Sequence, residues 1–283
     1  MKAGVALFFT QYSISPSQLA IALEERGFES LWAPEHSHIP FSRNSDFPKG
    51  GELPEKYQDV MDPFVTLSVA AAVTTSLKIA TGICLVVQRD PIQTAKSVAS
   101  LDQTSSGRFL FGVGAGWNAE EMENHGTNFK SRMPLLKERI EAMREIWGNE
   151  HASYHGKFVN FSKIISNPKP IQKPHPPIIV GGAFPHGAKR AIAYGDGWIP
   201  HAKRPAYDSV IDKISEFRRM ASLAGRNPDS LPITVFGIEE DLDRLPRYRD
   251  AGVERVVFSL PSNSSKDTLP LLDKYAFLIR NLN

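Results

Sequence analysis

The chain has 283 residues and is 41% hydrophobic, which is enough for one large buried core in a single domain, residues 1–283. Lys and Arg total 33 against 31 Asp and Glu, and the basic residues are scattered, so nucleic acid is not an expected partner. The chain has one cysteine, no signal-peptide core and no apolar run near the ~18 residues of a membrane span, so we expect a cytoplasmic protein without a disulfide or membrane contact.

Short β-rich apolar segments alternate with segments of helical period along the chain. We predict eight strands, at Lys2–Phe9, Ser30–Ala33, Leu77–Leu85, Arg108–Gly114, Pro177–Gly181, Asp196–Pro200, Ile233–Ile238 and Glu254–Ser259. The predicted helices follow them, at Ser17–Arg26, Phe64–Thr74, Ile92–Thr104, Leu135–Trp147, Gly187–Tyr194, Tyr207–Ala224, Leu242–Asp250 and Leu269–Ile279. Eight such units predict a closed (β/α)8 TIM barrel. An open doubly wound sheet is the alternative, but it would need fewer strands or a second domain.

Two segments are longer than the loops that a minimal barrel needs. Residues Glu35–Met61 follow the second strand and are rich in Pro, Ser, Gly and charge. They lie on the face where barrel enzymes build their sites, which makes them a candidate lid. Residues Glu150–Pro176 predict a small hairpin and then an extended proline segment leading into the fifth strand.

The second predicted strand runs into Trp32-Ala33-Pro34-Glu35-His36-Ser37-His38. The carboxyl ends of barrel strands hold catalytic groups, and an apolar strand and a proline turn would fix the direction of His36. We interpret His36 as a donor of a hydrogen bond or proton to a bound ring, and His38 as a loop residue. A metal-dependent hydrolase is a rival interpretation, because His36-Ser37-His38 resembles a metal-binding pair and His201 ends the sixth strand.

The third and fourth predicted strands end in glycines. Thr81-Gly82-Ile83 ends the third, where a glycine marks a bulge or a close ligand, and Cys84 beside it is interpreted as core. The fourth ends in Gly112-Val113-Gly114-Ala115-Gly116-Trp117-Asn118. The acidic residue of a dinucleotide fingerprint is missing, so we interpret these glycines as room for a flat ligand faced by Trp117 and Asn118. A glycine-rich turn with Trp117 in the core is the alternative.

The fifth strand ends in Val180-Gly181-Gly182-Ala183, and the sixth contains Gly195-Asp196-Gly197-Trp198. A Gly-Gly turn just before a helix exposes backbone N–H groups at the positive end of the helix dipole, which suits a phosphate. Turn geometry alone is an equal alternative.

Together these motifs resemble the luciferase-like monooxygenase superfamily over the whole chain. The segment from Asn167-Pro168-Lys169-Pro170 to His175-Pro176-Pro177 also falls in the family's order. Within the superfamily, the sequence is most similar to the deazaflavin (coenzyme F420)-dependent oxidoreductases, with FMN-dependent monooxygenases as the alternative. The resemblance implies a homodimer that transfers a hydride between the deazaflavin ring and a small organic substrate. A flavin carrier without chemistry is a further alternative.

The resemblance also implies a pocket. Glu35 and His36 would be catalytic beside the ring, and a cis Gly82–Ile83 bond would form a bulge behind it. The implied cofactor-binding residues are Thr81, Gly82, Ile83, Gly114, Ala115, Gly116, Trp117 and Asn118, together with the backbone N–H groups of Gly181, Gly182 and Ala183 on the phosphate. Candidate substrate contacts are Trp117, Trp198, His201 and Arg204. Trp117, His201 and Arg204 stand where sugar-phosphate dehydrogenases of this branch carry their catalytic and phosphate-binding residues, so we do not expect sugar-phosphate oxidation.

Overall fold

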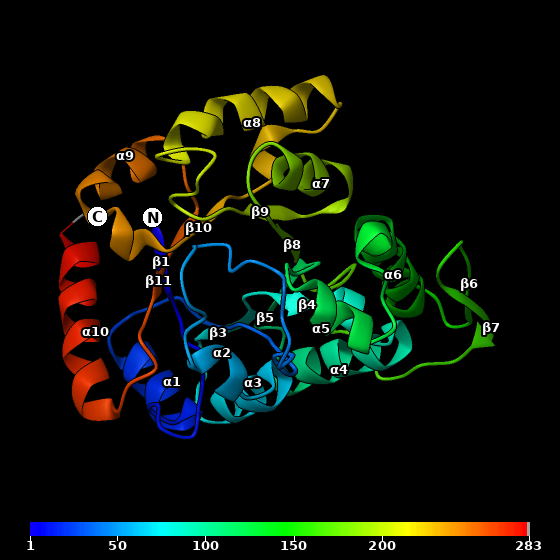
Figure 1. Ribbon diagram of the computed structural model, residues 1–283, viewed down its shortest axis with the longest axis horizontal. Coiled ribbons are helices and arrows are strands. Elements are labelled where there is room, and N and C mark those ends of the chain that lie inside the picture. Colours follow the sequence, from blue (N-terminus) through cyan, green and yellow to red (C-terminus); the bar gives the residue numbers. More distant parts are fainter. Residues whose placement is uncertain (282–283) are drawn as a thin grey trace.

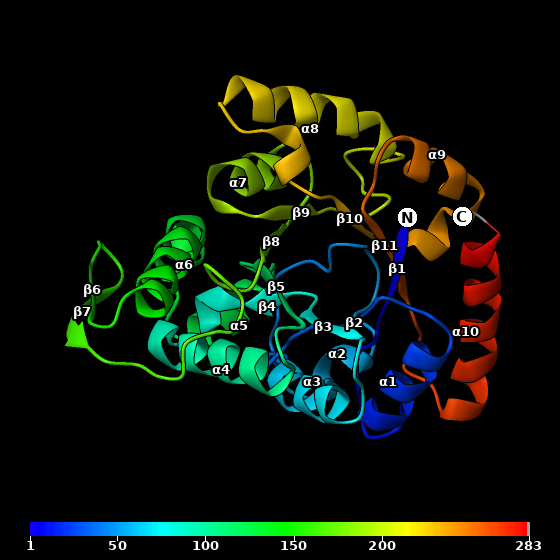
Figure 2. The same cartoon turned by 180° about the vertical axis from the view of Figure 1, so that it is seen from behind.

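Eight parallel strands form a closed ring in the computed structural model, which describes residues 1–281 (Figures 1 and 2). The strands are β1 (Lys2–Ala6), β2 (Ser30–Ala33), β3 (Lys78–Thr81), β5 (Phe109–Gly114), β8 (Ile178–Gly181), β9 (Gly197–Ile199), β10 (Thr234–Phe236) and β11 (Arg255–Ser259). Their order around the ring is β10, β11, β1, β2, β3, β5, β8, β9, and β4 (Cys84–Leu85) pairs with β5. Parallel bridges Trp198–Ile233 and His201–Phe236 join the two ends of this path. The predicted barrel is confirmed, and the open sheet is excluded.

Each strand of the ring contributes one buried apolar side chain to a layer inside the barrel: Ala6, Trp32, Ala80, Leu110, Ile179, Ile199, Phe236 and Val257. The small side chains of the two alanines leave space for the large rings of Trp32 and Phe236, which meet edge to face with centroids 5.3 Å apart. Trp32 Nε1 donates to Ser30 Oγ at 2.9 Å, so the buried indole is satisfied. The interior is a packed core, and a ligand site has to lie above it.

Helices cover the outside of the ring. They are α1 (Pro16–Glu25), α3 (Pro63–Ala72), α4 (Pro91–Thr104), α6 (Arg132–Gly148), α7 (His186–Tyr194), α8 (Ile211–Leu223), α9 (Leu245–Asp250) and α10 (Ser265–Arg280), with short helices α2 (Lys56–Asp59) and α5 (Ala119–Asn124) in loops. Side chains of Ser15, Asp62 and Asp90 accept first-turn N–H groups, each just before a proline, which favours a helix start at these points. The sequence did not predict α2 and α5, because four and six residues are too few to show a helical period.

The two predicted insertions take different forms. Strands β6 (Ala152–His155) and β7 (Asn160–Ile164) form the expected hairpin, which projects beyond α6 at the right of Figure 1. The proline segment after it contains cis bonds at Asn167–Pro168 and Lys173–Pro174. Residues 35–61 hold only α2 as regular structure, as a lid-like loop should. In residues 1–281, no helix is both long and apolar enough to cross a membrane.

Candidate active site at the barrel mouth

The third strand is interrupted at the barrel mouth. We predicted one strand over Leu77–Leu85, but β3 ends at Thr81 and β4 begins at Cys84. The predicted cis peptide bond between Gly82 and Ile83 lies in the gap. A Cβ on Gly82 would lie 2.8 Å from Phe236 Cζ, so this position has space only for glycine. The bulge therefore rests directly on the apolar layer of the barrel.

The glycines of β5 and β8 make room for neighbouring protein atoms. A Cβ on Gly112 would lie 2.0 Å from the Thr81 carbonyl oxygen, and Thr81 Oγ1 donates to the Gly112 carbonyl at 2.7 Å. A Cβ on Gly114 would lie 2.7 Å from Ile83 Cδ1, and one on Gly181 would lie 3.2 Å from Ile83 Cγ2. The sequence analysis interpreted the β5 glycines as room for a ligand. In the structure, Gly112 allows the close approach of Thr81 and Gly114 leaves space for Ile83 at the barrel mouth, and room for a ligand stays a prediction.

A buried histidine–carboxylate pair lies just beyond β2. His36 Nδ1 is 2.8 Å from Glu121 Oε2, and the Ser37 backbone N–H donates to Glu121 Oε1 at 3.0 Å. Burial alone raises the pKa of Glu121, but the hydrogen bond from His36 and the charge of His36 outweigh it, so the pKa lies below its ordinary value. An ionised Glu121 accepts a hydrogen bond from the Nδ1–H of His36, which leaves Nε2 available to exchange a proton with a ligand.

Glu121 is a functional candidate that the sequence analysis missed. It lies on α5, which was not predicted, and 85 residues separate it from His36. The available signal was the spacing Asn118-x-x-Glu121, which resembles a capping box. Asn118 does cap α5, since its Oδ1 accepts the Glu121 N–H at 3.3 Å. Its Nδ2 is buried without a hydrogen-bond partner, a condition that a bound polar group would relieve.

Aromatic side chains surround His36. The centroid of its ring lies 5.3 Å from that of Tyr57 and 5.9 Å from that of Trp117. Phe47 packs against both aromatic rings, with centroid distances of 5.2 Å to Tyr57 and 6.0 Å to Trp117. Tyr57 and Phe47 belong to the candidate lid, so the lid does reach the end of β2. Trp117 is partly exposed, and it faces this cluster rather than the core.

Helix α5 also fastens the lid. The Glu120 carboxylate accepts the backbone N–H groups of Asn44 at 2.8 Å and Ser45 at 3.1 Å. Ser45 Oγ in turn accepts the Ala119 N–H at 2.9 Å. These bonds hold the lid segment beside the His36 cluster.

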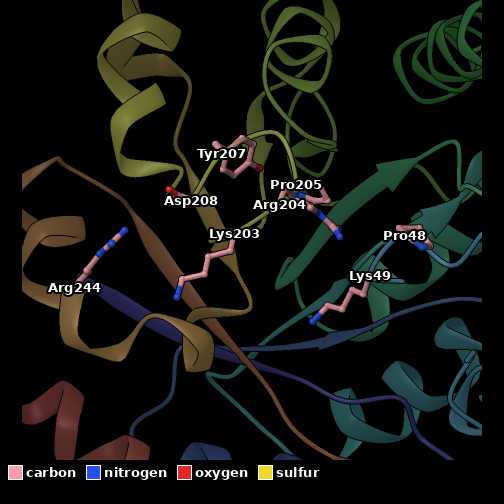
Figure 3. A pocket seen from close by; sticks show the side chains of 8 residues that line it. All are labelled: Pro48, Lys49, Lys203, Arg204, Pro205, Tyr207, Asp208 and Arg244. Carbon is pink, nitrogen blue, oxygen red and sulfur yellow. The ribbon is translucent and has the colours of Figure 1, made fainter. Parts of the chain in front are cut away.

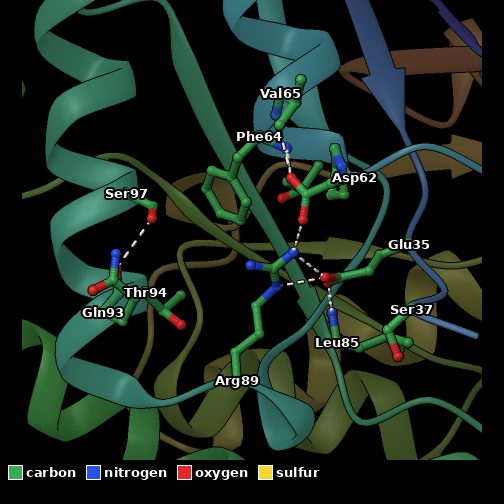
Figure 4. Close-up of polar contacts among 12 residues, drawn as sticks. Glu35, Ser37, Asp62, Phe64, Val65, Leu85, Arg89, Gln93, Thr94 and Ser97 are labelled. Atoms are coloured by element: carbon green, nitrogen blue, oxygen red, sulfur yellow. Dashed lines mark hydrogen bonds and ion pairs between the residues drawn. The ribbon is translucent and has the colours of Figure 1, made fainter.

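Glu35 has a structural environment, although the sequence analysis made it a catalytic candidate. One carboxylate oxygen pairs with the Arg89 guanidinium, and the other accepts the Leu85 N–H at 2.6 Å (Figure 4). Arg89 also pairs with Asp62, the cap of α3. Both oxygens of Glu35 are engaged within the protein, so Glu35 ties three segments together, and its catalytic role stays a prediction. Cys84 beside it is fully buried, which together with the Glu35 charge raises the pKa of its thiol, so the core interpretation of Cys84 is confirmed.

The Gly181-Gly182 turn is held from within the protein. The Gly182 N–H donates to the Ile199 carbonyl at 3.2 Å, so this N–H already has a partner within the protein, and its contact with a phosphate stays a prediction. Trp198 Nε1 donates to the Gly182 carbonyl at 2.9 Å. Trp198 is fully buried and stacks on Phe217 of α8 at 4.8 Å between ring centroids. Its side chain therefore lies between the strands and the helices, where it supports the turn, and not at the mouth as a substrate contact.

An arginine lies against this turn, and its charge also acts on Arg132 at the start of α6. A Cβ on Gly182 would lie 2.7 Å from Arg190 Nη2, which places that guanidinium against the turn. Burial lowers the pKa of Arg132, and the nearby charge of Arg190 lowers it further. In each arginine Nε is buried without a partner, and within residues 1–281 neither forms an ion pair. Arg132 also donates through Nη1 to the Phe129 carbonyl at 2.8 Å and lies over the Phe129 ring. A partly buried guanidinium with an unpartnered Nε, as in Arg190, suits an anion such as phosphate.

His201 and Arg204 lie on the loop after β9, beside an opening of about 510 Å³. Arg204 lines the opening together with Lys49 of the lid (Figure 3). Burial, followed by the charges of Arg204 and Lys49, lowers the pKa of His201 well below its ordinary value, so His201 is neutral at pH 7. The structure thus brings His201 and Arg204 to the mouth, whereas Trp198 lies elsewhere.

A metal centre finds no support in the part of the chain that the structure describes. No group of three or more His, Cys, Asp or Glu side chains there is arranged to hold a metal ion. His38 contacts Ser37 Oγ at 2.9 Å and Asn124 Nδ2 at 2.8 Å, and His36 is engaged by Glu121.

Fold and site together define a (β/α)8-barrel protein with a polar ligand site at the carboxyl ends of its strands. The model of the luciferase-like monooxygenase family matches residues 16–238, and the chain belongs to that family. The uncharacterized protein Rv0953c of Mycobacterium tuberculosis is 37% identical over 281 residues, covering 98% of each chain.

Relatives of stated activity use two cofactors. An F420-dependent hydroxymycolic acid dehydrogenase of M. tuberculosis is 30% identical over 75% of this chain and 55% of the relative. An FMNH(2)-dependent dimethylsulfone monooxygenase of Pseudomonas putida is 28% identical over 65% of this chain and 50% of the relative. The crystal structure of monooxygenase RslO1 from Streptomyces bottropensis has the same fold, with a TM-score of 0.77, 22% identity and 99% coverage of both chains. The family thus contains oxidoreductases and monooxygenases with deazaflavin or flavin cofactors.

Proposed function

We propose that this protein is a deazaflavin (coenzyme F420)-dependent oxidoreductase that acts on a small organic substrate. The observation that carries the proposal is the buried His36–Glu121 pair, whose free imidazole nitrogen lies at the mouth of a flavin-family barrel. The F420-dependent dehydrogenase among the relatives favours deazaflavin over FMN, because it aligns over three quarters of this chain.

The unpartnered polar atoms of the site suit such a cofactor. The guanidiniums of Arg132 and Arg190 would hold its phosphate beside the Gly181-Gly182 turn. The buried Asn118 Nδ2 would donate to a polar edge of the ring. Ile83, seated between Gly114 and Gly181, would support one face of the ring. When bound, the deazaflavin supplies a ring carbon that gives or accepts a hydride.

The residues of the chain would orient the substrate and handle the proton. Glu121 fixes the His36 ring through Nδ1, so Nε2 gives a proton to a substrate oxygen or removes one. Tyr57, Phe47 and Trp117 would keep water away from that exchange. Glu120 holds the lid segment in the place that this requires.

A side-by-side titration of the purified protein with oxidised deazaflavin and FMN tests this function. We expect tighter binding of deazaflavin, detected by the change in its visible absorbance, followed by turnover in a substrate screen with the reduced cofactor. Tighter binding of FMN would replace the proposal by a flavin-dependent monooxygenase. Deazaflavin binding without turnover of any substrate would favour a carrier, and binding of neither would contradict the proposal.

A further inference from the structure

The lid lies on the protein without burying its side chains. His36 and Pro63 are buried, but each residue in the range 37–62 between them is exposed or half-buried. The segment is therefore held by contacts at the surface and adds nothing to the core. Segments with few buried contacts open locally at a lower cost in free energy than packed helices and strands do.

Both ends of the lid are nevertheless anchored. At the first end, the Ser37 N–H donates to the Glu121 carboxylate at 3.0 Å. At the second end, the Met61 N–H donates to the Phe9 carbonyl at 2.8 Å. Residues 39–54, which we call the lid centre, lie between these anchors and contain no helix or strand. We therefore expect any movement of the lid to occur in its centre.

A clamp on α5 holds the lid centre in place. The Oε1 atom of Glu120 accepts the backbone N–H groups of Asn44 and Ser45, and we call these two bonds the Glu120 clamp. Near the clamp, the Phe47 ring lies against Trp117, with centroids 6.0 Å apart. Both bonds of the clamp end on the same oxygen, whereas Oε2 of Glu120 is buried without a hydrogen-bond partner. Opening of the lid would let water reach Oε2, which favours breaking the clamp.

Neighbouring residues of α5 bind different parts of the site. Glu121 pairs with His36, and their side chains are only 1% and 6% exposed, so this pair is shielded from water. Glu120 is half-buried and binds the lid centre. Because the two carboxylates hold different segments, the Glu120 clamp can break without loss of the hydrogen bond between Glu121 and His36.

We propose that the lid centre opens by breaking the Glu120 clamp while Glu121 keeps His36 in place, and that this opening admits a ligand to the His36 ring. In the closed position, Phe47 packs against Tyr57 and Trp117, which both contact that ring. Departure of Phe47 gives a ligand room beside it. Glu120 is then a positioning residue that controls ligand entry and release. The identity of the ligand rests on the proposed function, whereas the opening itself does not.

Trypsin cleavage and acrylamide quenching test the opening on the full chain without a cofactor. Arg43 and Lys49 are tryptic sites in the lid centre. Trp117 is partly exposed, whereas the other three tryptophans are at most 3% exposed, so acrylamide reports on Trp117. Glu120→Ala should speed cleavage at the two sites about tenfold, because two charge-assisted hydrogen bonds are lost. It should also increase the quenching. Glu120→Gln, which keeps an acceptor oxygen, should lie between Glu120→Ala and the wild type.

Glu123→Ala, an exposed position on the same helix, is the matched control and should behave like the wild type. Ser45→Ala changes the lid and leaves α5 intact, and it should also increase both signals, because Ser45 Oγ accepts the Ala119 N–H. Cleavage and quenching at wild-type levels in Glu120→Ala would overturn the inference. So would a change in the ¹⁵N NMR signals of His36 in that variant, since the lid and His36 would then move together.

Deazaflavin is added to the same samples to separate the two proposals. Its association, followed by stopped flow, should be about tenfold faster in Glu120→Ala, because the open state is more populated. Lid opening without deazaflavin binding would refute the proposed function alone. Turnover with deazaflavin, combined with wild-type cleavage of Glu120→Ala, would refute the lid opening alone.

Discussion

Two clusters of charge near the same end of the barrel have opposite character. In the first, Arg89 pairs with both Glu35 and Asp62, and the other Glu35 oxygen accepts a backbone N–H. In the second, Arg132 and Arg190 each have a buried Nε without a partner, and burial and the charge of Arg190 lower the pKa of Arg132. A closed network stabilises the fold, whereas like charges left together destabilise it unless a ligand is bound. The comparison favours the arginines with unpartnered Nε atoms over Glu35 as the proposed place of a bound ligand.

Breaking the closed network should give the largest effect. Arg89→Met leaves the buried Glu35 carboxylate without its cation, so we expect the free energy of unfolding to fall by about 3 kcal/mol in denaturant titrations. The control is Arg219→Met, whose partner Glu216 is exposed, and we expect no measurable change there. An Arg89→Met protein as stable as the control would mean that the network does not hold the fold.

The His36–Glu121 pair combines features of both clusters. Nδ1 of His36 is hydrogen-bonded to Glu121, as in the closed network, whereas Nε2 is open to a ligand. His36→Ala should lower turnover by ~10²-fold, with His155→Ala on the hairpin as the control. Glu121→Gln should lower turnover less and change which nitrogen of His36 carries the proton, as observed by ¹⁵N NMR. An unchanged tautomer in this variant would remove Glu121 as a positioning residue.

Removing an arginine from the Arg132–Arg190 cluster should affect ligand binding rather than the stability of the fold, in contrast to breaking the Glu35–Arg89–Asp62 network. Arg190→Gln should weaken deazaflavin binding by about tenfold, because a charge-assisted contact to phosphate is lost. The apoprotein should be as stable as the wild type or more so, since the repulsion with Arg132 is relieved. Lys189→Gln, an exposed neighbour on α7, is the matched control. If Arg190→Gln lost stability and kept the cofactor affinity of the wild type, the Arg132–Arg190 cluster would be structural and not a ligand site.

The smallest effect concerns pH. The pKa of His201 in the folded protein lies well below its ordinary value because of burial and the charges of Arg204 and Lys49. As pH falls below about 6.5, the unfolded chain therefore takes up a proton at this site before the native protein does, and stability declines. His201→Gln should reduce the loss of stability between pH 7 and pH 5 in thermal unfolding. An identical pH dependence in the variant and the wild type would show that His201 is not held neutral.

The sequence by itself determined the barrel. Alternation of apolar strands and helical segments predicts eight βα units, because each segment's period reflects the face it buries. The resemblance implied the cis Gly82–Ile83 bond, and the residues after the fourth predicted helix predicted the hairpin; the bond, the hairpin and the family are confirmed. These are local properties that neighbouring residues carry.

Only the tertiary structure decided which side chains meet. Glu35 and Arg89 are 54 positions apart and His36 and Glu121 are 85 apart, so their pairing depends on how the strands and loops of the barrel are brought together. The same holds for Trp198, whose residue type suited a substrate contact but whose side chain points into the layer beneath α8. Arg132 and Arg190 carry no local signal at all, because an unpaired charge is defined by the absence of a partner in space.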